Sequence, residues 1–486
     1  MEPWILTTKQ VRFVENYTCN EFQITSLDLI EKAGKSSAET FIHEMNVKKN
    51  DFILIFSGPH TNGLDAFSMA QTLHNKQFLH VKLISVIRDF VEAPFELYTV
   101  SAISQMEVVK EYIQKSTFIV DGIFGTGVNK NITGIYKHII EEINHSGKKI
   151  YAIDLPSGID SNNGIKKKHA VKADVTGVIG AYKVGNFLGD ALDFSGKLVL
   201  IPIDLQFDEI RKAYKLTKEV FPLLKTRKDN SHKYEYGNVI SIGGSFEYFG
   251  AINLSAFAAL RCGTGLSSVA VNEDDVPFIS PIYPELILSK YKTKEELFTL
   301  VENKNAVLFG PGLHPEKAKL AFLEMLISTH KPLVIDGGGI ELLKEVTIPL
   351  HKNIVITPHL GELAKYFGLT SKTVQKDPVK YITKLSKKGI TVVLKGATTI
   401  IQNKANMIFM KTGNPGMATS GMGDVLSGII LSFLGNKFSP YESALYGVSL
   451  HSKAGNLGKE EKGESSLVAS DLYQYIPEIL KLGENQ

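Results

Sequence analysis

Cysteine is scarce in this sequence: Cys19 and Cys262 are the two that occur among its 486 residues. Two thiols exclude a disulfide framework and a thiolate zinc site, and they are typical of a reducing compartment. The sequence also lacks an apolar run long enough to span a bilayer, and it does not begin with a basic segment followed by an apolar stretch. We therefore expect a soluble, cytoplasmic protein without a membrane partner.

An excess of one charge is also absent. Lysine and arginine number 54 and aspartate and glutamate 51, so the formal net charge is only +3. The lysines are dispersed, apart from short runs such as residues 166–168, and they form no basic stripe of the kind that binds nucleic acid. We expect no nucleic-acid partner.

Repeated strand and turn patterns indicate the fold class. Short apolar runs recur, and each is followed by a glycine-containing turn and a helical pattern, which is typical of parallel strands covered on both faces. One series lies at 52–56, 81–86, 117–121 and 149–154, and a second at 238–244, 305–312, 332–339, 353–359 and 391–396. The chain length allows two to three domains. We predict an α/β protein with domains at 1–215 and 225–486.

Turns of the second series carry the most distinctive motifs. Ligands of open parallel sheets bind at the carboxyl ends of the strands, which is where these turns fall. They are 243–245 (GGS), 310–312 (GPG), 336–338 (DGG), 358–359 (PH), 395–399 (KGATT) and 416–428 (GMATSGMGDVLSG). Six such turns at one edge predict a ligand cleft.

Asp424 stands out in the last of these turns. Backbone N–H groups at the start of a helix and the helix dipole bind anions. A carboxylate beside them can accept a proton from an attacking hydroxyl, so the pair indicates phosphoryl transfer to an alcohol. The alternative is that Asp424 merely caps the helix.

The motifs of both halves resemble one known family. The segments 241–251 (SIGGSFEYFGA), 308–313 (LFGPGL), 357–362 (TPHLGE), KGATT and the Asp424 turn are similar to the ribokinase-type domain of NAD(P)HX dehydratases. The segments 26–34 (SLDLIEKAG), 119–127 (IVDGIFGTG) and 152–160 (AIDLPSGID) are similar to NAD(P)HX epimerase domains. The chain thus resembles the bifunctional NAD(P)H-hydrate repair enzymes along nearly its whole length.

This resemblance implies a Rossmann-like three-layer domain followed by a ribokinase-like domain. It implies ADP as phosphoryl donor, with ATP possible, and Mg²⁺. Phosphorylation of the ring hydroxyl of hydrated NADH or NADPH makes a good leaving group, and the ring nitrogen then expels it. Asp424 would be the general base and would also bind the hydrate together with Ala251, Gly312 and His359. The nucleotide would bind to Lys395, Gly396, Ala397, Thr398, Thr399 and Gly423.

For the first domain, the resemblance implies interconversion of the R and S hydrates. Asp154 would be the catalytic residue and Lys183 would neutralise substrate phosphate. K⁺ would be bound by Asn62, Asp121 and Ser157. The residues expected to bind the hydrate are Thr61, Asn62, Gly63, Leu64, Asp65, Gly125, Thr126, Gly127, Val128, Asn129, Lys130, Asn131 and Asp154.

Several positions depart from the family pattern. His60, Thr61, Leu64 and Ala66 replace a glycine, an asparagine and two glycines, and glycine in such a turn permits left-handed φ and close approach of a ligand. This loop raises the alternative that the first domain is a non-catalytic binding or dimerisation module. Ser420, Met422 and Tyr234 depart from the pattern in the second domain, where the Met422 side chain could crowd the site.

A second alternative is a small-alcohol kinase for a vitamin precursor, because such kinases share the fold and the Asp424 turn. The sequence does not distinguish ADP from ATP, or NADH hydrate from NADPH hydrate. Relatives of both halves are usually multimers, so we expect a homo-oligomer.

Overall fold

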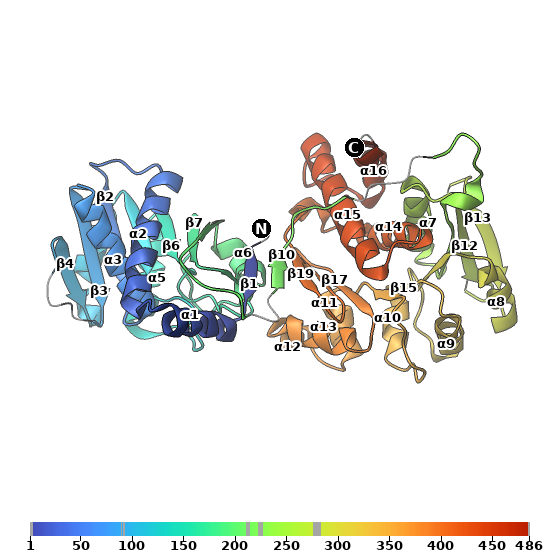
Figure 1. The fold of residues 1–486 in the computed structure, drawn as a ribbon, viewed down its shortest axis with the longest axis horizontal. Coiled ribbons are helices and arrows are strands. Elements are labelled where there is room, and N and C mark those ends of the chain that lie inside the picture. Colours follow the sequence, from blue (N-terminus) through green and yellow to red (C-terminus); the bar gives the residue numbers. More distant parts are fainter. Residues whose placement is uncertain are drawn as a thin grey trace. The chain divides into compact units, whose positions relative to one another are not determined.

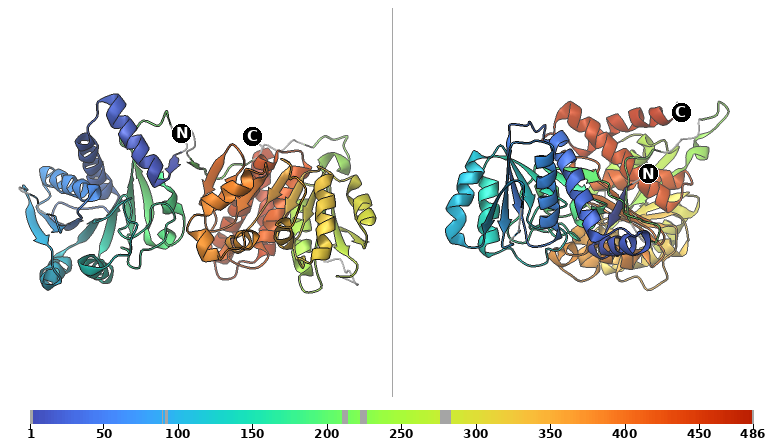
Figure 2. Two further views of the ribbon diagram at one scale, coloured as in Figure 1. Left: turned by 90° about the horizontal axis from the view of Figure 1, so that it is seen from below. Right: turned by 60° about the vertical axis from the view of Figure 1, so that its left-hand side comes forward.

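The computed structural model describes residues 3–88, 90, 93–209, 214–221, 227–275 and 283–484. The chain divides into two compact units, Met1–Lys215 and Leu216–Gln486. Each unit is described by itself below, and Figures 1 and 2 show their elements.

The N-terminal unit contains a parallel sheet of seven strands in the order β4-β3-β2-β5-β6-β7-β9. Its strands are β2 (Phe52–Ser57), β3 (His80–Val86), β4 (Glu96–Val100), β5 (Phe118–Gly122), β6 (Lys149–Ile153), β7 (Val175–Ile179) and β9 (Lys197–Ile201). Short strands β1 (Trp4–Leu6) and β8 (Tyr182–Lys183) pair in parallel. The α/β prediction is confirmed for this unit.

Helices cover both faces of this sheet. On one face α2 (Ser26–Glu44) and α3 (Thr61–Asn75) bury Phe41 and Met69 against the strands. On the other face α4 (Met106–Lys115) and α5 (Gly134–His145) bury isoleucine and valine side chains against the strands. Figure 1 shows α2 and α3 side by side. Burial on both faces explains why the strands are continuous apolar runs.

Helix α1 (Thr8–Phe22) precedes α2 and starts with a capping box formed by Thr7 and Gln10. Thr25 and Asp28 form a second capping box at the start of α2. Two reciprocal side-chain bonds satisfy N–H groups that the first turn of a helix leaves unpaired. Both helix starts are therefore set locally.

The C-terminal unit has a sheet in the order β13-β12-β11-β14-β15-β16-β17-β18-β19. The strands are β11 (Asn238–Ile242), β12 (Leu266–Asn272), β13 (Ile287–Tyr291), β14 (Ala306–Phe309), β15 (Leu333–Ile335), β16 (Ile354–Ile356), β17 (Thr391–Leu394), β18 (Thr399–Gln402) and β19 (Met407–Met410). In this order, every pair of neighbouring strands from β13 through β12 and β11 to β17 is parallel, as predicted. The pairs β17–β18 and β18–β19 are antiparallel. A short turn at 395–398 forces that change of direction, because parallel strands need a long crossover.

Helices again cover the sheet on two sides. One layer consists of α7 (Phe249–Arg261), α14 (Met422–Gly435) and α15 (Pro440–Lys462), whose apolar residues pack with those of the strands. The other helices include α8 (Lys294–Glu302), α9 (Leu320–Ser328), α10 (Gly338–Leu343), α11 (Leu360–Tyr366), α12 (Ser371–Gln375) and α13 (Pro378–Ser386). The first view of Figure 2 shows these yellow and orange helices in front of the sheet. The α/β prediction is confirmed for this unit too.

Candidate active sites

Asp424 lies in the first turn of α14. The helix starts after Gly421, whose φ is 86°, and no side chain caps this end. Asp424 is therefore not the N-cap, and the capping alternative is wrong. Gly421, Met422 and Gly423 present the free N–H groups of a long helix that has a buried apolar body, so the helix end is rigid and electropositive.

Lys395 brings three acidic side chains together at this helix end. Its Nζ donates to Asp336 Oδ1 at 2.8 Å and lies 3.9 Å from Glu362 Oε2. A Cβ on Gly423 would lie 3.2 Å from the same Nζ, so the turn before Asp424 touches the KGATT segment. Residues far apart in the sequence thus meet at the carboxyl edge of the sheet.

Burial and neighbouring charges set the protonation behaviour of this cluster. Burial raises the pKa of Asp424 to about 7; the negative charges of Asp336 and Glu362 act in the same direction and Lys395 opposes them. Burial also raises the pKa of Glu362 to about 7. A carboxylate with a pKa near neutrality is suited to accept a proton at physiological pH.

Lys395 and Asp424 were predicted from the sequence to be functional residues, whereas Asp336 and Glu362 were not. Asp336 is 2% exposed and directly follows β15, and Glu362 lies in the first turn of α11. Both were inside motifs recognised from the sequence, DGG and TPHLGE. Nothing in the sequence pairs either of them with Lys395, because the contact depends on the order of strands in the sheet.

His359 has a structural role. It is the N-cap of α11, and its Nδ1 accepts hydrogen bonds from the N–H groups of Gly361 and Glu362 at 2.9 and 3.2 Å. Burial lowers the pKa of His359, so the neutral ring that accepts these bonds is favoured. The backbone of His359 pairs with that of Lys395 next to β17.

The remaining predicted residues of this unit lie in neighbouring turns. Ala251 is in the first turn of α7, and Gly312 follows β14 with a φ of 65°. A Cβ on Gly312 would lie 2.3 Å from the carbonyl oxygen of Tyr248, so this position requires glycine. Gly396, Ala397, Thr398 and Thr399 form the β17–β18 turn, in which Thr398 Oγ1 is buried and has no hydrogen-bond partner among the described residues.

The three departures in this unit differ in their burial. Met422 is 5% exposed and packs in an apolar cluster with Val425 and Leu467, and its φ is not positive, so the crowding that its side chain suggested is absent. Ser420 is exposed. Tyr234 is 61% exposed and precedes β11, so it lies at the amino end of that strand rather than the carboxyl end.

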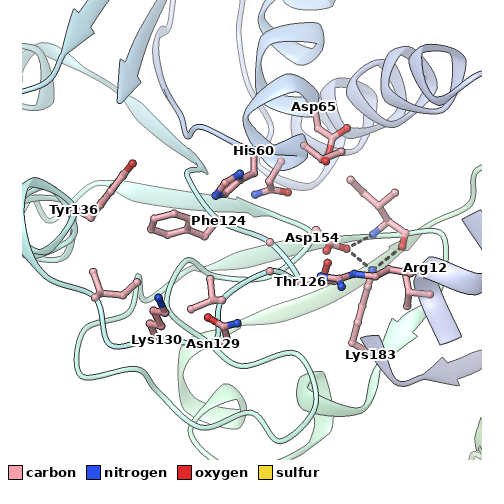
Figure 3. Close-up of a pocket in the computed structure, with 18 of the residues that line it drawn as sticks. Arg12, His60, Asp65, Phe124, Thr126, Asn129, Lys130, Tyr136, Asp154 and Lys183 are labelled. Atoms are coloured by element: carbon pink, nitrogen blue, oxygen red, sulfur yellow. Dashed lines mark hydrogen bonds and ion pairs between the residues drawn. The ribbon is translucent and has the colours of Figure 1, made fainter. Parts of the chain in front are cut away.

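The N-terminal unit contains a cavity of about 640 Å³ (Figure 3). Most residues predicted to bind the hydrate line it: Thr61, Asn62, Asp65, Gly125, Thr126, Gly127, Val128, Asn129, Lys130, Asn131 and Asp154. Gly63 and Leu64 are not among its lining residues.

Asp154 is positioned by an unusual backbone conformation and an ion pair. It directly follows β6, and its φ is 68°, a left-handed value that is rare outside glycine. Its carboxylate contacts Lys183 Nζ and accepts the N–H of Ile179 at 3.2 Å. Figure 3 shows both contacts. Lys183 is 1% exposed, and it also donates to the Ile179 carbonyl at 2.8 Å. Lys183 therefore pairs with Asp154 at the cavity wall.

Of the residues implied for K⁺, Asn62 lines the cavity, and Asp121 and Ser157 are fully buried. Asp121 accepts hydrogen bonds from the Ser157 N–H at 2.7 Å and the Ser157 hydroxyl at 2.6 Å. Asn62 donates its amide N–H to the Ile153 carbonyl, and its Oδ1 would lie 3.1 Å from a Cβ on Gly125. Burial raises the pKa of Asp121 to about 6. These are hard oxygen donors of low total charge, which fit K⁺.

The altered glycine loop forms the start of α3. His60 is the N-cap, and positive φ values are not found at His60, Thr61, Leu64 or Ala66. Side chains at these positions therefore cause no left-handed strain. The glycines that this loop retains have no room for a side chain. A Cβ on Gly63, for example, would lie 1.9 Å from the Gly58 carbonyl oxygen.

Helix α1 contributes cavity residues that the sequence analysis missed. Arg12 and Glu15 line the cavity, and Arg12 is exposed there. Burial raises the pKa of Glu15; Lys183 and Arg12 lower it and Asp154 raises it further. The capping box at Thr7 signals the helix, but only the packing of α1 places these side chains near Asp154.

Among the described residues, no three His, Cys, Asp or Glu side chains are grouped so as to hold a metal ion. Within the same described ranges, no helix is long and apolar enough to cross a bilayer. Each unit of this α/β protein brings acidic and basic side chains together, Asp154 with Lys183 in one and Asp424 with Lys395 at the start of α14 in the other, as in an enzyme.

Comparison with known proteins gives the family. Residues 239–478 match the family described as NAD(P)H-hydrate dehydratase, and residues 26–185 match YjeF-related protein N-terminus. A bifunctional NAD(P)H-hydrate repair enzyme of Coxiella burnetii is 31% identical over 96% of this chain and 97% of its own. The Escherichia coli relative of that name is 31% identical over 74% of this chain and 71% of its own. The chain belongs to the family of bifunctional NAD(P)H-hydrate repair enzymes.

A solved structure is similar to the C-terminal part. It is an ADP/ATP-dependent NAD(P)H-hydrate dehydratase of Bacillus subtilis, co-crystallised with ATP and Mg²⁺. It is 28% identical, with a TM-score of 0.49, and it covers 54% of this chain and 95% of its own. The family assignment means that the C-terminal unit is a nucleotide-dependent dehydratase and the N-terminal unit an epimerase of hydrated NADH and NADPH. The family assignment therefore excludes the alternative that this chain is a small-alcohol kinase for a vitamin precursor.

Proposed function

We propose that Asp424 is the general base of the dehydratase. It takes the proton from the ring hydroxyl of the S hydrate while that oxygen attacks the terminal phosphate of the nucleotide. The observation that carries this proposal is the cluster of Asp424 with Lys395, Asp336 and Glu362 at the start of α14. The phosphorylated oxygen then leaves as phosphate, pushed by the lone pair of the ring nitrogen, and the reduced nicotinamide forms.

Main-chain N–H groups at the start of α14 bind the transferred phosphoryl group in this proposal. Lys395 and the turn containing Thr398 bind the nucleotide; the buried, unpaired Thr398 hydroxyl supports this. Ala251, Gly312 and His359 line the hydrate site. Mg²⁺ bound with the nucleotide would neutralise phosphate charge. ADP is the donor expected from the resemblance, and the Bacillus relative was crystallised with ATP.

For the N-terminal unit, we propose that Asp154 moves the proton when the ring hydroxyl is lost and water re-adds. K⁺ would be held by Asn62, Asp121 and Ser157. Arg12 and Lys130 are the cations of the cavity wall that can pair with the pyrophosphate of a dinucleotide. Gly63 and Leu64 are in the same turn as the cavity residues without lining the cavity, so we expect them to support its shape.

Asp424→Asn and Asp154→Asn test both proposals in the full chain. With the S hydrate, ADP and Mg²⁺, Asp424→Asn should lower the recovery of near-ultraviolet absorbance by about 100-fold or more, since general-base catalysis contributes that much. Asp154→Asn should retain this rate but fail to interconvert R and S. Asp229→Asn, at an exposed position, is the control. Full dehydratase activity in Asp424→Asn would remove Asp424 from the mechanism.

We also propose that the protein is cytoplasmic and forms homo-oligomers. The two free thiols support the cytoplasmic location. Relatives of both halves are usually multimers, which supports a homo-oligomer. Light scattering of the purified chain tests the second point directly.

A further inference from the structure

Asp65 is an acidic side chain of the epimerase cavity without a partner. It lies in the second turn of α3, lines the cavity and is 7% exposed. Among the described residues, its carboxyl oxygens take part in no hydrogen bond or ion pair. Figure 3 shows Asp65 and Asp154 at the same cavity, on α3 and after β6 respectively. A buried ionised carboxylate without a partner is costly, so this site favours the neutral acid.

The charges around Asp65 act in the same direction. Burial is the main cause that raises the pKa of Asp65 well above its usual value, and the negative charges of Asp154 and Glu15 raise it further. Lys183 opposes them, but it is already paired with Asp154. The other ionisable side chains of the cavity wall are His60, Lys130, Tyr136 and Arg12.

Asp154 has the opposite environment. The Lys183 ammonium and the Ile179 N–H both contact its carboxylate. Two carboxyl groups in one cavity, of which one is paired with a cation and the other is not, are the arrangement from which an acid–base pair can be built.

We propose that Asp65 is a second catalytic residue of the epimerase, the proton donor that works together with the base Asp154. This inference rests on the proposed epimerase site. The carboxylic acid of Asp65 protonates the ring hydroxyl of the hydrate. The C–O bond breaks, water leaves, and the lone pair of the ring nitrogen forms an iminium cation.

Water then adds to the other face of the same carbon. Asp154 accepts a proton from this water as the new C–O bond forms, and the iminium electrons return to nitrogen. One water leaves and one enters, and a proton has moved from Asp65 to Asp154. The reverse reaction, or proton exchange with solvent through the cavity, restores the starting state. No oxidant, reductant or leaving group other than water is required.

Asp65→Asn tests this role because the amide keeps the shape of the side chain and cannot release a proton. With the R hydrate alone and without nucleotide, chromatographic separation of R and S should show kcat reduced about 100-fold or more. KM should change little, and the dehydratase rate of the same molecules on the S hydrate should stay unchanged. Asp193→Asn, an exposed aspartate of the same unit, should epimerise normally.

The pH profile distinguishes a proton donor from a structural residue. Wild-type epimerisation should decline as pH rises through the titration of Asp65, and the residual rate of Asp65→Asn should lack that decline. The infrared difference spectrum of the wild type minus Asp65→Asn should contain the C=O stretch of a protonated carboxylic acid, because the other buried acids are present in both proteins and cancel.

Retention of more than a third of the wild-type kcat, an unchanged decline at high pH, or the absence of the protonated-acid band would each overturn the role of Asp65. The variant Asp154→Asn distinguishes a failure of the Asp65 inference from a failure of the proposed epimerase site. If it is inactive while Asp65→Asn is active, the inference about Asp65 fails alone. If both variants epimerise normally, the proposed epimerase site is itself wrong.

Discussion

The single residues that matter most are carboxylates whose charge is unfavourable where they lie. Asp424, Glu362 and Asp65 are held in places where burial favours the neutral form. Such placement costs stability, and it raises the pKa of Asp424 and of Glu362 to about 7, so these two groups can exchange protons near neutral pH. The sequence motif predicted that Asp424 is a functional residue. The direction of its pKa shift depends on neighbours that only the fold brings beside it.

Asp424→Asn should therefore stabilise the C-terminal unit at high pH. The pKa of Asp424 is raised from about 3.8 to about 7 on folding, so the folded state binds more protons in that window and its stability falls as pH rises through it. The variant has no such loss. We expect it to be more stable than wild type by about 1 kcal/mol at pH 8, after allowance for solvent screening, and equal below pH 4.

Calorimetric melting of the full chain across this pH range measures the difference. Asp229→Asn, which alters an exposed carboxylate, should show no pH-dependent gap. A gap of the same size at pH 4 and pH 8 would mean that ionisation of Asp424 is not its cause.

At the scale of elements, two helix starts shape the two sites. α14 begins at a glycine with left-handed φ, and α3 begins at the altered loop without any left-handed residue. The first requires glycine, and the second does not.

Gly421→Ala should damage the dehydratase more than an ordinary glycine replacement. A Cβ on Gly421 would lie 2.6 Å from Leu254 Cδ1 and 3.0 Å from the Ala469 Cβ, and φ is 86°. Gly389 also has a positive φ, 95°, but a Cβ there would meet no atom within 4 Å. Gly389→Ala should cost about 1 kcal/mol for backbone strain, and Gly421→Ala about 1–3 kcal/mol more for overpacking.

Denaturant unfolding of the two variants gives this comparison, and dehydratase kinetics should show a loss of kcat only in Gly421→Ala. Equal destabilisation of the two would show that the space around Gly421 adapts and that its α14 start is not rigid.

The altered loop of the epimerase should be harmless. Restoring glycine with Leu64→Gly and Ala66→Gly should not raise the epimerisation rate, because neither position has left-handed φ and Leu64 does not line the cavity. Both positions are in the first turns of α3, so the double variant should lose about 1–2 kcal/mol of stability. Melting temperature and the rate of R-to-S conversion are the measurements. A large gain in rate would instead show that the loop impairs the native site.

At the scale of the whole molecule, two chemistries occupy two separate compact units. Each carboxylate proposed as catalytic interacts with side chains of its own unit: Asp154 with Lys183, and Asp424 with Lys395, Asp336 and Glu362. A shared intermediate, the S hydrate, can leave one unit and enter another by diffusion.

An equimolar mixture of Asp154→Asn and Asp424→Asn should therefore convert the R hydrate completely to the reduced dinucleotide in the presence of ADP and Mg²⁺. Either variant alone should fail with the R hydrate. Recovery of nicotinamide absorbance measures the reaction, and the wild type at half concentration is the reference. Failure of the mixture would mean that the two sites must belong to one chain.

Local patterns were enough to predict the α/β class, the parallel strands and the motif that contains Asp424. Strand runs, capping boxes and glycine turns depend on residues close in sequence, so they are legible without a structure. The antiparallel hairpin of β18 and β19 was missed because the strand-and-helix alternation around it suggested parallel order.

Partnerships between distant residues had to come from the folded chain. The ion pairs of Lys183 with Asp154 and of Lys395 with Asp336, and the entry of α1 into the epimerase cavity, each join segments far apart in sequence. The order of strands in a sheet and the packing of helices on it bring these segments together. Burial and charge at those meeting points then set which carboxylates carry protons, and no local pattern encodes either quantity.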